Sequence, residues 1–123
     1  MGRIEKINEQ LRREISVIIQ RELTDPRLEL VTITEVITSR DLRHAKVYFS
    51  VLGDPKKVQE SQNGLTAARG LIRKLAGQRM KVRYIPEFLF VHDKTLEISA
   101  RIEAALEEIH NEPKKVDEDY SEK

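Results

Sequence analysis

The part of this sequence that could do chemistry is a basic segment without a single acid. Between Ser61 and Pro86 the chain carries six Lys or Arg residues and no Asp or Glu, although it has 22 basic and 21 acidic residues overall. Outside this window 16 basic residues face 21 acidic ones, so a nearly neutral chain contains a segment of charge +6. Such a concentration of charge predicts a polyanionic partner. The six residues are Arg69, Arg73, Lys74, Arg79, Lys81 and Arg83.

A single-stranded nucleic acid on this segment would be held by phosphate contacts, which depend on salt. Base specificity would need aromatic or polar groups nearby. Tyr48 is expected on the outer face of its strand and is therefore the stacking residue that we predict, whereas Tyr84, Phe88 and Phe90 are expected in the core. The alternative is that the six basic residues form only a solvated face. A window of this length without an acid makes that alternative the weaker one.

Groups that could perform catalysis are scarce. The chain has no Cys, no phosphate-binding loop and no Gly-x-Ser-x-Gly elbow. Its histidines, His44, His92 and His110, lack the spacing of a metal site. His92-Asp93 falls where a strand is predicted to end, and a strand end followed by a helix N-cap is preferred over a small nuclease that uses this pair. We therefore expect no enzyme, no catalytic residue, no metal and no cofactor.

The composition indicates one small domain in a reducing compartment. A chain of 123 residues is large enough for one modest core. The absence of Cys excludes disulfides. The first residues lack the apolar centre of a signal peptide, and no apolar run approaches the length of a membrane span. We expect a cytoplasmic protein.

The first half of the chain predicts a helix followed by a β-hairpin. Apolar residues recur every three or four positions over residues 3–23, and Pro26 ends this helix because proline disfavours helical geometry before it. Residues 30–38 and 45–51 are rich in β-branched and alternating apolar residues, and their short link favours a hairpin. Glu35 lies on the apolar face of the first strand and indicates either a bulge or the end of the buried region.

The next segment predicts two helices joined by a kink. Asp54 is a suitable N-cap and Pro55 a suitable first helical residue. Ala68-Arg69-Gly70 interrupts the pattern, and because glycine in a helix costs about 1 kcal/mol relative to alanine, we expect a packing reason for Gly70. Gly77 is then predicted to cap the second helix.

A third strand is predicted from Met80, with Lys81 and Arg83 on its outer face. Met80, Val82, Tyr84, Phe88 and Phe90 would share the core face. A final helix is expected from about Lys94 to His110. The domain would thus cover residues 1–110, and the polar, acidic tail 111–123 is predicted to be disordered.

This order of elements is that of a type II KH-like domain: α+β, with a three-stranded sheet. Such domains clamp nucleic-acid backbone with a Gly-x-x-Gly loop, whose place is taken here by Ala68-Arg69-Gly70. Over residues 3 to about 110 the chain resembles the bacterial ribosome-binding factor A family. The resemblance rests on Asp25-Pro26-Arg27, Val31-Thr32-Ile33-Thr34, Ser39-Arg40-Asp41-Leu42, Ala45-Lys46-Val47-Tyr48-Phe49-Ser50, Ala68-Arg69-Gly70-Leu71-Ile72-Arg73, Arg83-Tyr84-Ile85-Pro86-Glu87-Phe88 and Ala100-Arg101-Ile102.

The resemblance implies a non-enzymatic, monomeric assembly factor. Members of that family bind the immature small (30S) ribosomal subunit, contact its 16S rRNA, and assist late maturation and processing of the rRNA 5′ end, most of all in the cold. They leave before translation, and a ribosome-associated GTPase is thought to assist their release. The alternative from another class is a protein-interaction module that docks an acidic partner such as that GTPase.

Overall fold

The computed structural model describes residues 2–94 and 105–106. The chain divides into two units, Met1–Asp93 and Lys94–Lys123, and all the elements below belong to the first. The helix expected from about Lys94 to His110 and the tail 111–123 therefore lie, apart from Lys94, Ala105 and Leu106, outside the described residues. Within the described part, no helix combines the length and the apolar character needed to cross a bilayer.

The first helix, α1, spans Arg3–Val17 and continues into a π-helical turn at Ile18–Glu22. Both lie within the helix predicted for residues 3–23. A 3₁₀ turn at Pro26–Leu28 follows, capped by the Asp25 carboxylate, which accepts a hydrogen bond from the backbone N–H of Arg27 at 2.9 Å. The predicted stop is confirmed because helical geometry ends before Asp25. The residues that α1 and its π-helical turn bury completely are Leu11, Ile15 and Ile18.

A bulged hairpin follows. Strands β1 (Val31–Thr38) and β2 (His44–Val51) pair antiparallel, as predicted. Ile33 lies opposite Phe49 and Glu35 lies opposite the next residue, Tyr48, so one extra residue is accommodated between them. Of the two interpretations of Glu35, the bulge is the one observed. The bulge also exchanges the faces of β1, because the next buried residue is Val36, while Ile37 is 47% exposed.

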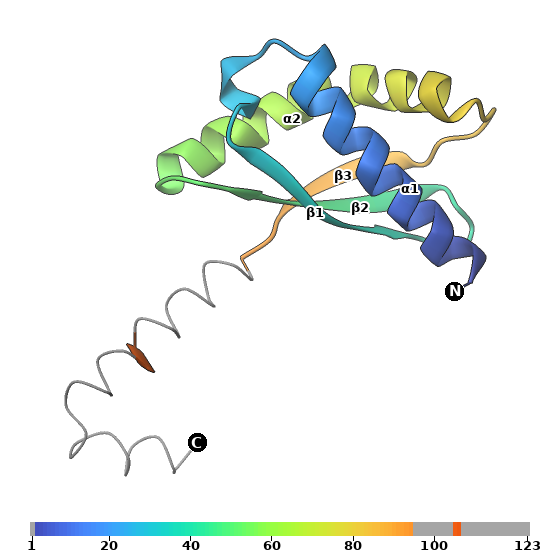
Figure 1. Ribbon diagram of the computed structural model, residues 1–123, viewed down its shortest axis with the longest axis horizontal. Helices are drawn as coiled ribbons and strands as arrows, with labels where there is room; N and C mark the ends of the chain where they lie inside the picture. The colour runs from blue at the N-terminus through green and yellow to red at the C-terminus, as the bar shows by residue number, and fades with distance from the viewer. Residues whose placement is uncertain (1, 95–104, 107–123) are drawn as a thin grey trace. The chain divides into compact units, whose positions relative to one another are not determined.

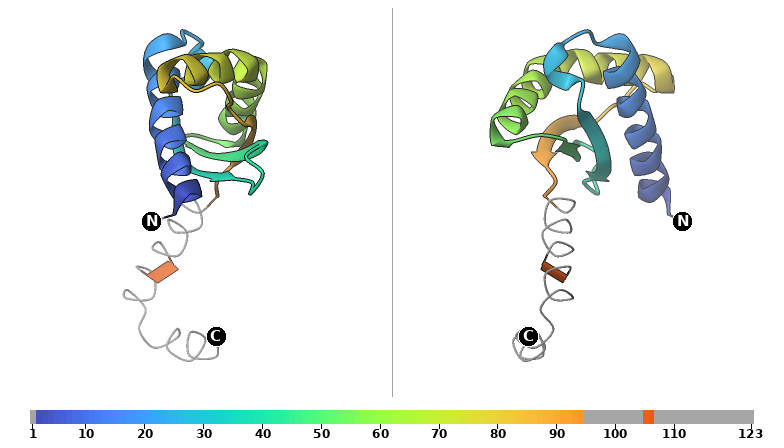
Figure 2. Two further views of the ribbon diagram at one scale, coloured as in Figure 1. Left: turned by 90° about the vertical axis from the view of Figure 1, so that its right-hand side faces the viewer. Right: turned by 60° about the vertical axis from the view of Figure 1, so that its left-hand side comes forward.

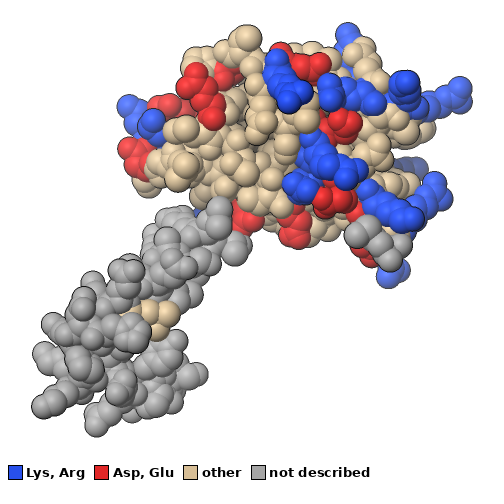
Figure 3. Space-filling view, in the orientation of Figure 1, with Lys and Arg blue, Asp and Glu red and all other residues tan. Residues whose placement is uncertain are grey.

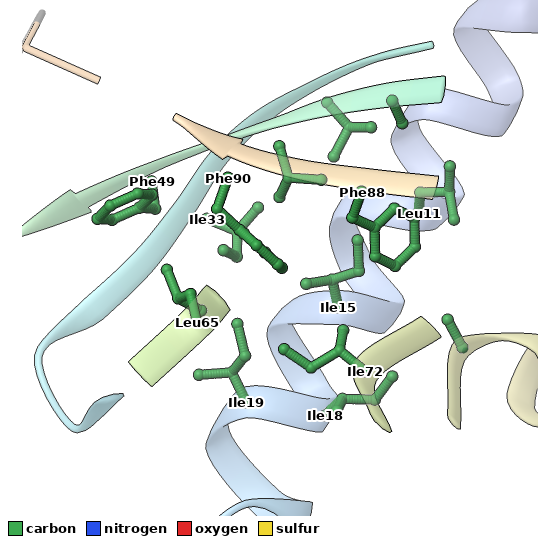
Figure 4. Packing of buried hydrophobic residues seen from close by; sticks show 14 of the residues in the cluster. Leu11, Ile15, Ile18, Ile19, Ile33, Phe49, Leu65, Ile72, Phe88 and Phe90 are labelled. Atoms are coloured by element: carbon green, nitrogen blue, oxygen red, sulfur yellow. The ribbon is translucent and has the colours of Figure 1, made fainter. Parts of the chain in front are cut away.

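The third strand, β3 (Glu87–His92), pairs parallel with β2 and completes a sheet of order β1-β2-β3 (Figure 1). A parallel neighbour requires a crossover connection, and the long helix α2 supplies it. Helices α1 and α2 lie on the same side of the sheet, where their apolar side chains meet those of the strands (Figure 4). The residues labelled in this core are Leu11, Ile15, Ile18, Ile19, Ile33, Phe49, Leu65, Ile72, Phe88 and Phe90.

The prediction of two helices joined at Ala68-Arg69-Gly70 is wrong in one respect. A single helix, α2, runs without interruption from Pro55 to Met80, and its predicted cap at Asp54 is confirmed by a 3.0 Å bond from the backbone N–H of Lys57. Its ribbon changes direction along its length, so the helix bends without breaking (Figure 2). One glycine weakens a helix by only about 1 kcal/mol, which burial of Leu65 and Ile72 on either side outweighs.

The end of α2 also differs from the prediction. Gly77 lies inside the helix, and the capping residue is Lys81, in the left-handed region at φ 56° and ψ 38°. Residues 81–86 form a connection, and β3 begins only at Glu87, directly after a proline that cannot donate to the ladder. The expected alternation of Lys81 and Arg83 on a strand is therefore wrong.

Two of the residues assigned to the core face of this strand lie outside the core. Phe88 and Phe90 are buried, as predicted. Val82 and Tyr84 precede the strand instead, and they are 45% and 81% exposed. The core prediction is thus right for β3 and wrong for the connection before it.

Candidate nucleic-acid interface

The C-terminal half of α2 and the connection 81–86 line a hollow of about 520 Å³ that is open to solvent. We call it the basic hollow. It carries three cations, Arg73 and Lys74 from α2 and Arg83 from the connection. The other lining residues are Gly70, Gly77, Gln78, Val82 and Ile85. The structure therefore brings together cations from α2 and from the connection that follows it.

The connection is attached to α2 by Arg73. Its guanidinium donates two hydrogen bonds to the carbonyl oxygen of Ile85, from Nε at 3.1 Å and from Nη2 at 2.8 Å. Ile85 is only 8% exposed and lies in ordinary van der Waals distance of a methyl group built at Gly77. A guanidinium has five N–H donors, so Arg73 fixes the wall of the basic hollow and keeps donors for a ligand.

Arg79 is directed elsewhere. Its Nε lies 3.0 Å from Glu14 Oε1 and its Nη1 lies 3.7 Å from Glu22 Oε1, so two carboxylates of the preceding helical segment neutralise it. It does not line the basic hollow. Of the six predicted binding residues, this is the one that the structure assigns to packing between helices.

The remaining predicted residues stay available. Arg69 and Lys81 are exposed and adjoin lining residues in the sequence. In the part of the chain that the structure describes, no carboxylate lies within ion-pair distance of Arg69, Lys81 or the three cations of the hollow. Arg12 and Arg27, by contrast, are paired with Glu9 and Asp25. Five of the six predicted cations therefore carry positive charge without an ion pair to a described carboxylate.

The surface view agrees with this distribution. In Figure 3, Lys and Arg are concentrated toward the right-hand side of the face shown, where Figure 1 places the C-terminal half of α2 and the N-terminal half of α1. Asp and Glu are more frequent toward its left and centre. A polyanion approaching this side meets a net positive surface.

Gly70 contributes space to the basic hollow. A Cβ built on Gly70 would meet no atom within 4 Å, whereas one built on Gly64 would lie 3.1 Å from Leu28 Cδ2. Gly64 is therefore a packing glycine, and the packing reason expected for Gly70 is wrong. An exposed glycine in a helix interior is unfavourable by about 1 kcal/mol, yet here it leaves the helix backbone open beside Arg69 and Arg73.

Of the aromatic side chains discussed above, Tyr84 is the one that lies differently from the prediction. Tyr48 lies on the outer face of the sheet, as expected, but it is half-buried there opposite Glu35. Tyr84, predicted in the core, is 81% exposed between the lining residues Arg83 and Ile85. The sequence signal that could have revealed this is Pro86, which makes a continuous strand through residues 80–90 unfavourable.

His92 and Asp93 are part of the fold at the end of β3. The His92 ring lies 5.6 Å from the Phe49 ring, and the Asp93 Oδ2 accepts a hydrogen bond from the Thr34 hydroxyl at 2.7 Å. Thr34 is the extra residue of the β1 bulge. Among the described residues, no group of three or more His, Asp or Glu side chains is placed to hold a metal ion. These contacts favour the structural interpretation of the pair.

The chain matches known proteins over most of its length. The family model described as ribosome-binding factor A matches residues 3–106. The chain is 49% identical to ribosome-binding factor A of Halothermothrix orenii over 110 residues, which are 89% of this chain and 90% of that one. It is 41% identical to the Brevibacillus brevis protein of the same name over 116 residues, 94% and 96% of the two chains.

Solved structures give the same result. The crystal structure of ribosome-binding factor A from Thermus thermophilus matches with a TM-score of 0.67 and 25% identity, over 75% of this chain and 97% of that one. The solution structure of a Thermotoga maritima protein, a suggested ribosome-binding factor A, matches with a TM-score of 0.60 and 32% identity, over 77% and 93%. A Thermus thermophilus homology model fitted into a cryo-EM map of its 30S complex matches with a TM-score of 0.61 and 26% identity, over 76% and 96%. The predicted α+β, KH-like fold is confirmed.

Proposed function

The chain belongs to the ribosome-binding factor A family, and on that premise we propose that it binds the immature small (30S) ribosomal subunit by contacting its 16S rRNA through the basic hollow. The observation that carries this proposal is the set of unpaired cations, Arg73, Lys74 and Arg83, held together by α2 and the connection 81–86. The 30S complex of the Thermus thermophilus relative supports the choice of partner.

The geometry suits the backbone of a folded or single-stranded RNA. A hollow open to solvent offers little enclosure for a small ligand, whereas phosphates can lie along its rim. Each phosphate neutralised by Lys or Arg releases counterions, so affinity falls steeply with salt. Three to five such contacts give a moderate affinity, which suits a factor that must leave its subunit.

The finer steps belong to the same proposal. A protein that prefers one rRNA conformer shifts the population toward it, and this matters most in the cold, where rRNA helices rearrange slowly. We place the chain in late maturation and processing of the rRNA 5′ end, as a cytoplasmic monomer that acts without catalysis. A ribosome-associated GTPase would assist its release.

The test is a double charge reversal at the basic hollow. We expect Arg69→Glu with Arg83→Glu to leave folding intact and to abolish co-sedimentation with immature small subunits, because it replaces two cations with two repelling anions. The matched control is Lys56→Glu with Lys57→Glu, an equal charge change at the other, exposed end of α2. Normal co-sedimentation of the first double variant would show that the site lies elsewhere. Binding that depends on an added GTPase instead of rRNA would favour the protein-interaction alternative.

A further inference from the structure

Tyr84 is an aromatic side chain that does not pack into the hydrophobic core. It is 81% exposed, and no hydrogen bond or ring contact involves it within the described part of the chain. Its neighbour Val82 is 45% exposed. A tyrosine can bury well over 100 Å² of surface, so leaving this ring in water forgoes a large stabilisation that a bound partner can recover.

The backbone on either side of Tyr84 is fixed. Ile85 is buried, and its carbonyl oxygen holds the two bonds from Arg73. Two residues further on, the backbone N–H of Glu87 donates to Arg43 O at 2.9 Å as β3 begins. The ring is therefore presented from an anchored segment, which reduces the entropy that a ligand must remove on binding.

The position of the ring relates it to the cations. Arg83 and Ile85, which flank it in the sequence, both line the basic hollow. The Tyr84 side chain itself is not among the lining residues, so an RNA strand whose phosphates contact Arg83 would meet the ring outside the hollow. Bases in a duplex are stacked on one another and cannot use it, but an unpaired base can.

We propose that Tyr84 stacks on an unpaired base of the RNA whose phosphates lie on the basic hollow. This inference rests on the proposed function and adds to it the chemical class of the bound segment, which is a single-stranded loop or linker. Stacking of a base on an aromatic side chain is tolerant of sequence. Tyr84 would thus select unpaired over paired RNA without reading a code.

Two oligonucleotides separate stacking from phosphate binding: a ten-nucleotide single-stranded RNA and a strand of equal length without bases. We expect Tyr84→Ala to weaken binding of the base-bearing strand by about 5- to 150-fold, the range that corresponds to one lost base–aromatic stack. Its affinity for the abasic strand should stay within about twofold of the unsubstituted chain. Tyr84→Phe should retain both affinities, and Leu52→Ala, at another exposed apolar residue (78%), serves as the control.

A spectroscopic readout follows from the absence of Trp in the chain. Tyr84→Trp introduces a single tryptophan, whose fluorescence should be quenched by the base-bearing strand and unchanged by the abasic one. An equal loss of affinity for both strands in Tyr84→Ala, or no loss for either, would overturn stacking while the proposed function stands. Failure of the unsubstituted chain to bind either strand at low salt would overturn both.

Discussion

The guanidinium of Arg73 donates two hydrogen bonds to the carbonyl oxygen of Ile85, at 3.1 and 2.8 Å, and so attaches the connection 81–86 to the C-terminal half of α2. One side chain thereby has two tasks. It holds the connection that carries Arg83 and Tyr84 against α2, and it contributes a positive charge of its own. Shape and charge at this site are not independent.

Arg73→Lys separates the two tasks, because lysine keeps the charge and cannot reproduce the planar pair of donors. We expect a loss of about 1 kcal/mol in the free energy of unfolding, below the roughly 1.5–3 kcal/mol of hydrogen bonds to charged groups, because Arg73 is exposed. RNA affinity should fall as well, although the net charge is unchanged. Urea unfolding and RNA titration measure the two effects. Lys74→Arg, which alters no such bond, is the control, and equal behaviour of the two variants would contradict this role.

Removal of the charge should affect RNA binding at Arg83 and stability at Arg79. Arg83→Gln removes a cation of the basic hollow, so the slope of log affinity against log salt should decrease by about 0.7, the value for one phosphate contact on a single strand. Arg79→Gln should leave this slope unchanged and lower stability by up to about 1 kcal/mol, because it removes partly exposed ion pairs with Glu14 and Glu22. Equal salt slopes for the two variants would show that Arg79 also contacts RNA.

Gly70 and Gly64 provide a second contrast. Gly70→Ala should raise the free energy of unfolding by about 0.5 to 1 kcal/mol, because the new methyl group meets nothing and alanine favours the helix. The same methyl group narrows the basic hollow, so RNA affinity should decrease. In Gly64→Ala the methyl group would lie 3.1 Å from Leu28 Cδ2, and stability should fall instead. Thermal unfolding and RNA titration distinguish the two. A Gly70→Ala variant that is less stable would restore the packing interpretation.

The sequence predicted those features that depend on local chemistry. The cap at Asp54, the stop before Pro26 and the alternating strand β2 all follow from short patterns, and the structure has them. Glu35 indicated a bulge as one of two possibilities, because a charged residue on an apolar face requires some irregularity. The order of the elements was predicted from the same kind of pattern, and the family resemblance agreed with it.

The features that were not predicted from the sequence depend on packing and ion pairs between residues far apart in the chain. Gly70 suggested a break, but burial of α2 residues on both sides keeps the helix continuous. Residues 80–86 alternate like a strand, yet Met80 completes α2 and Lys81 adopts a left-handed cap, which no pattern specifies. The pairing of Arg79 with Glu14 joins residues 65 positions apart. Charge alone identified the candidate segment, and the fold determines which of its cations lack an ion pair among the described residues.

The ion pair of Asp25 with Arg27 predicts part of the response to acid. Side-chain and backbone hydrogen bonds from Arg27 hold the pKa of Asp25 below its ordinary value of 3.8. Since the folded pKa is depressed, the stabilisation is fully present above about pH 4 and is lost as the pH falls through the folded pKa. Asp25→Asn keeps an N-cap acceptor but removes this titration, so unfolding free energy should vary less with pH below 4. Arg27→Gln should flatten the same slope, and the double variant should flatten it no further. Urea unfolding from pH 2.5 to 7 provides the measurement. An unchanged slope in Asp25→Asn would assign the acid response to other carboxylates, such as Glu9 and Asp41. Hydrogen bonds from Arg12 and Ser39, respectively, lower the pKa values of these two groups.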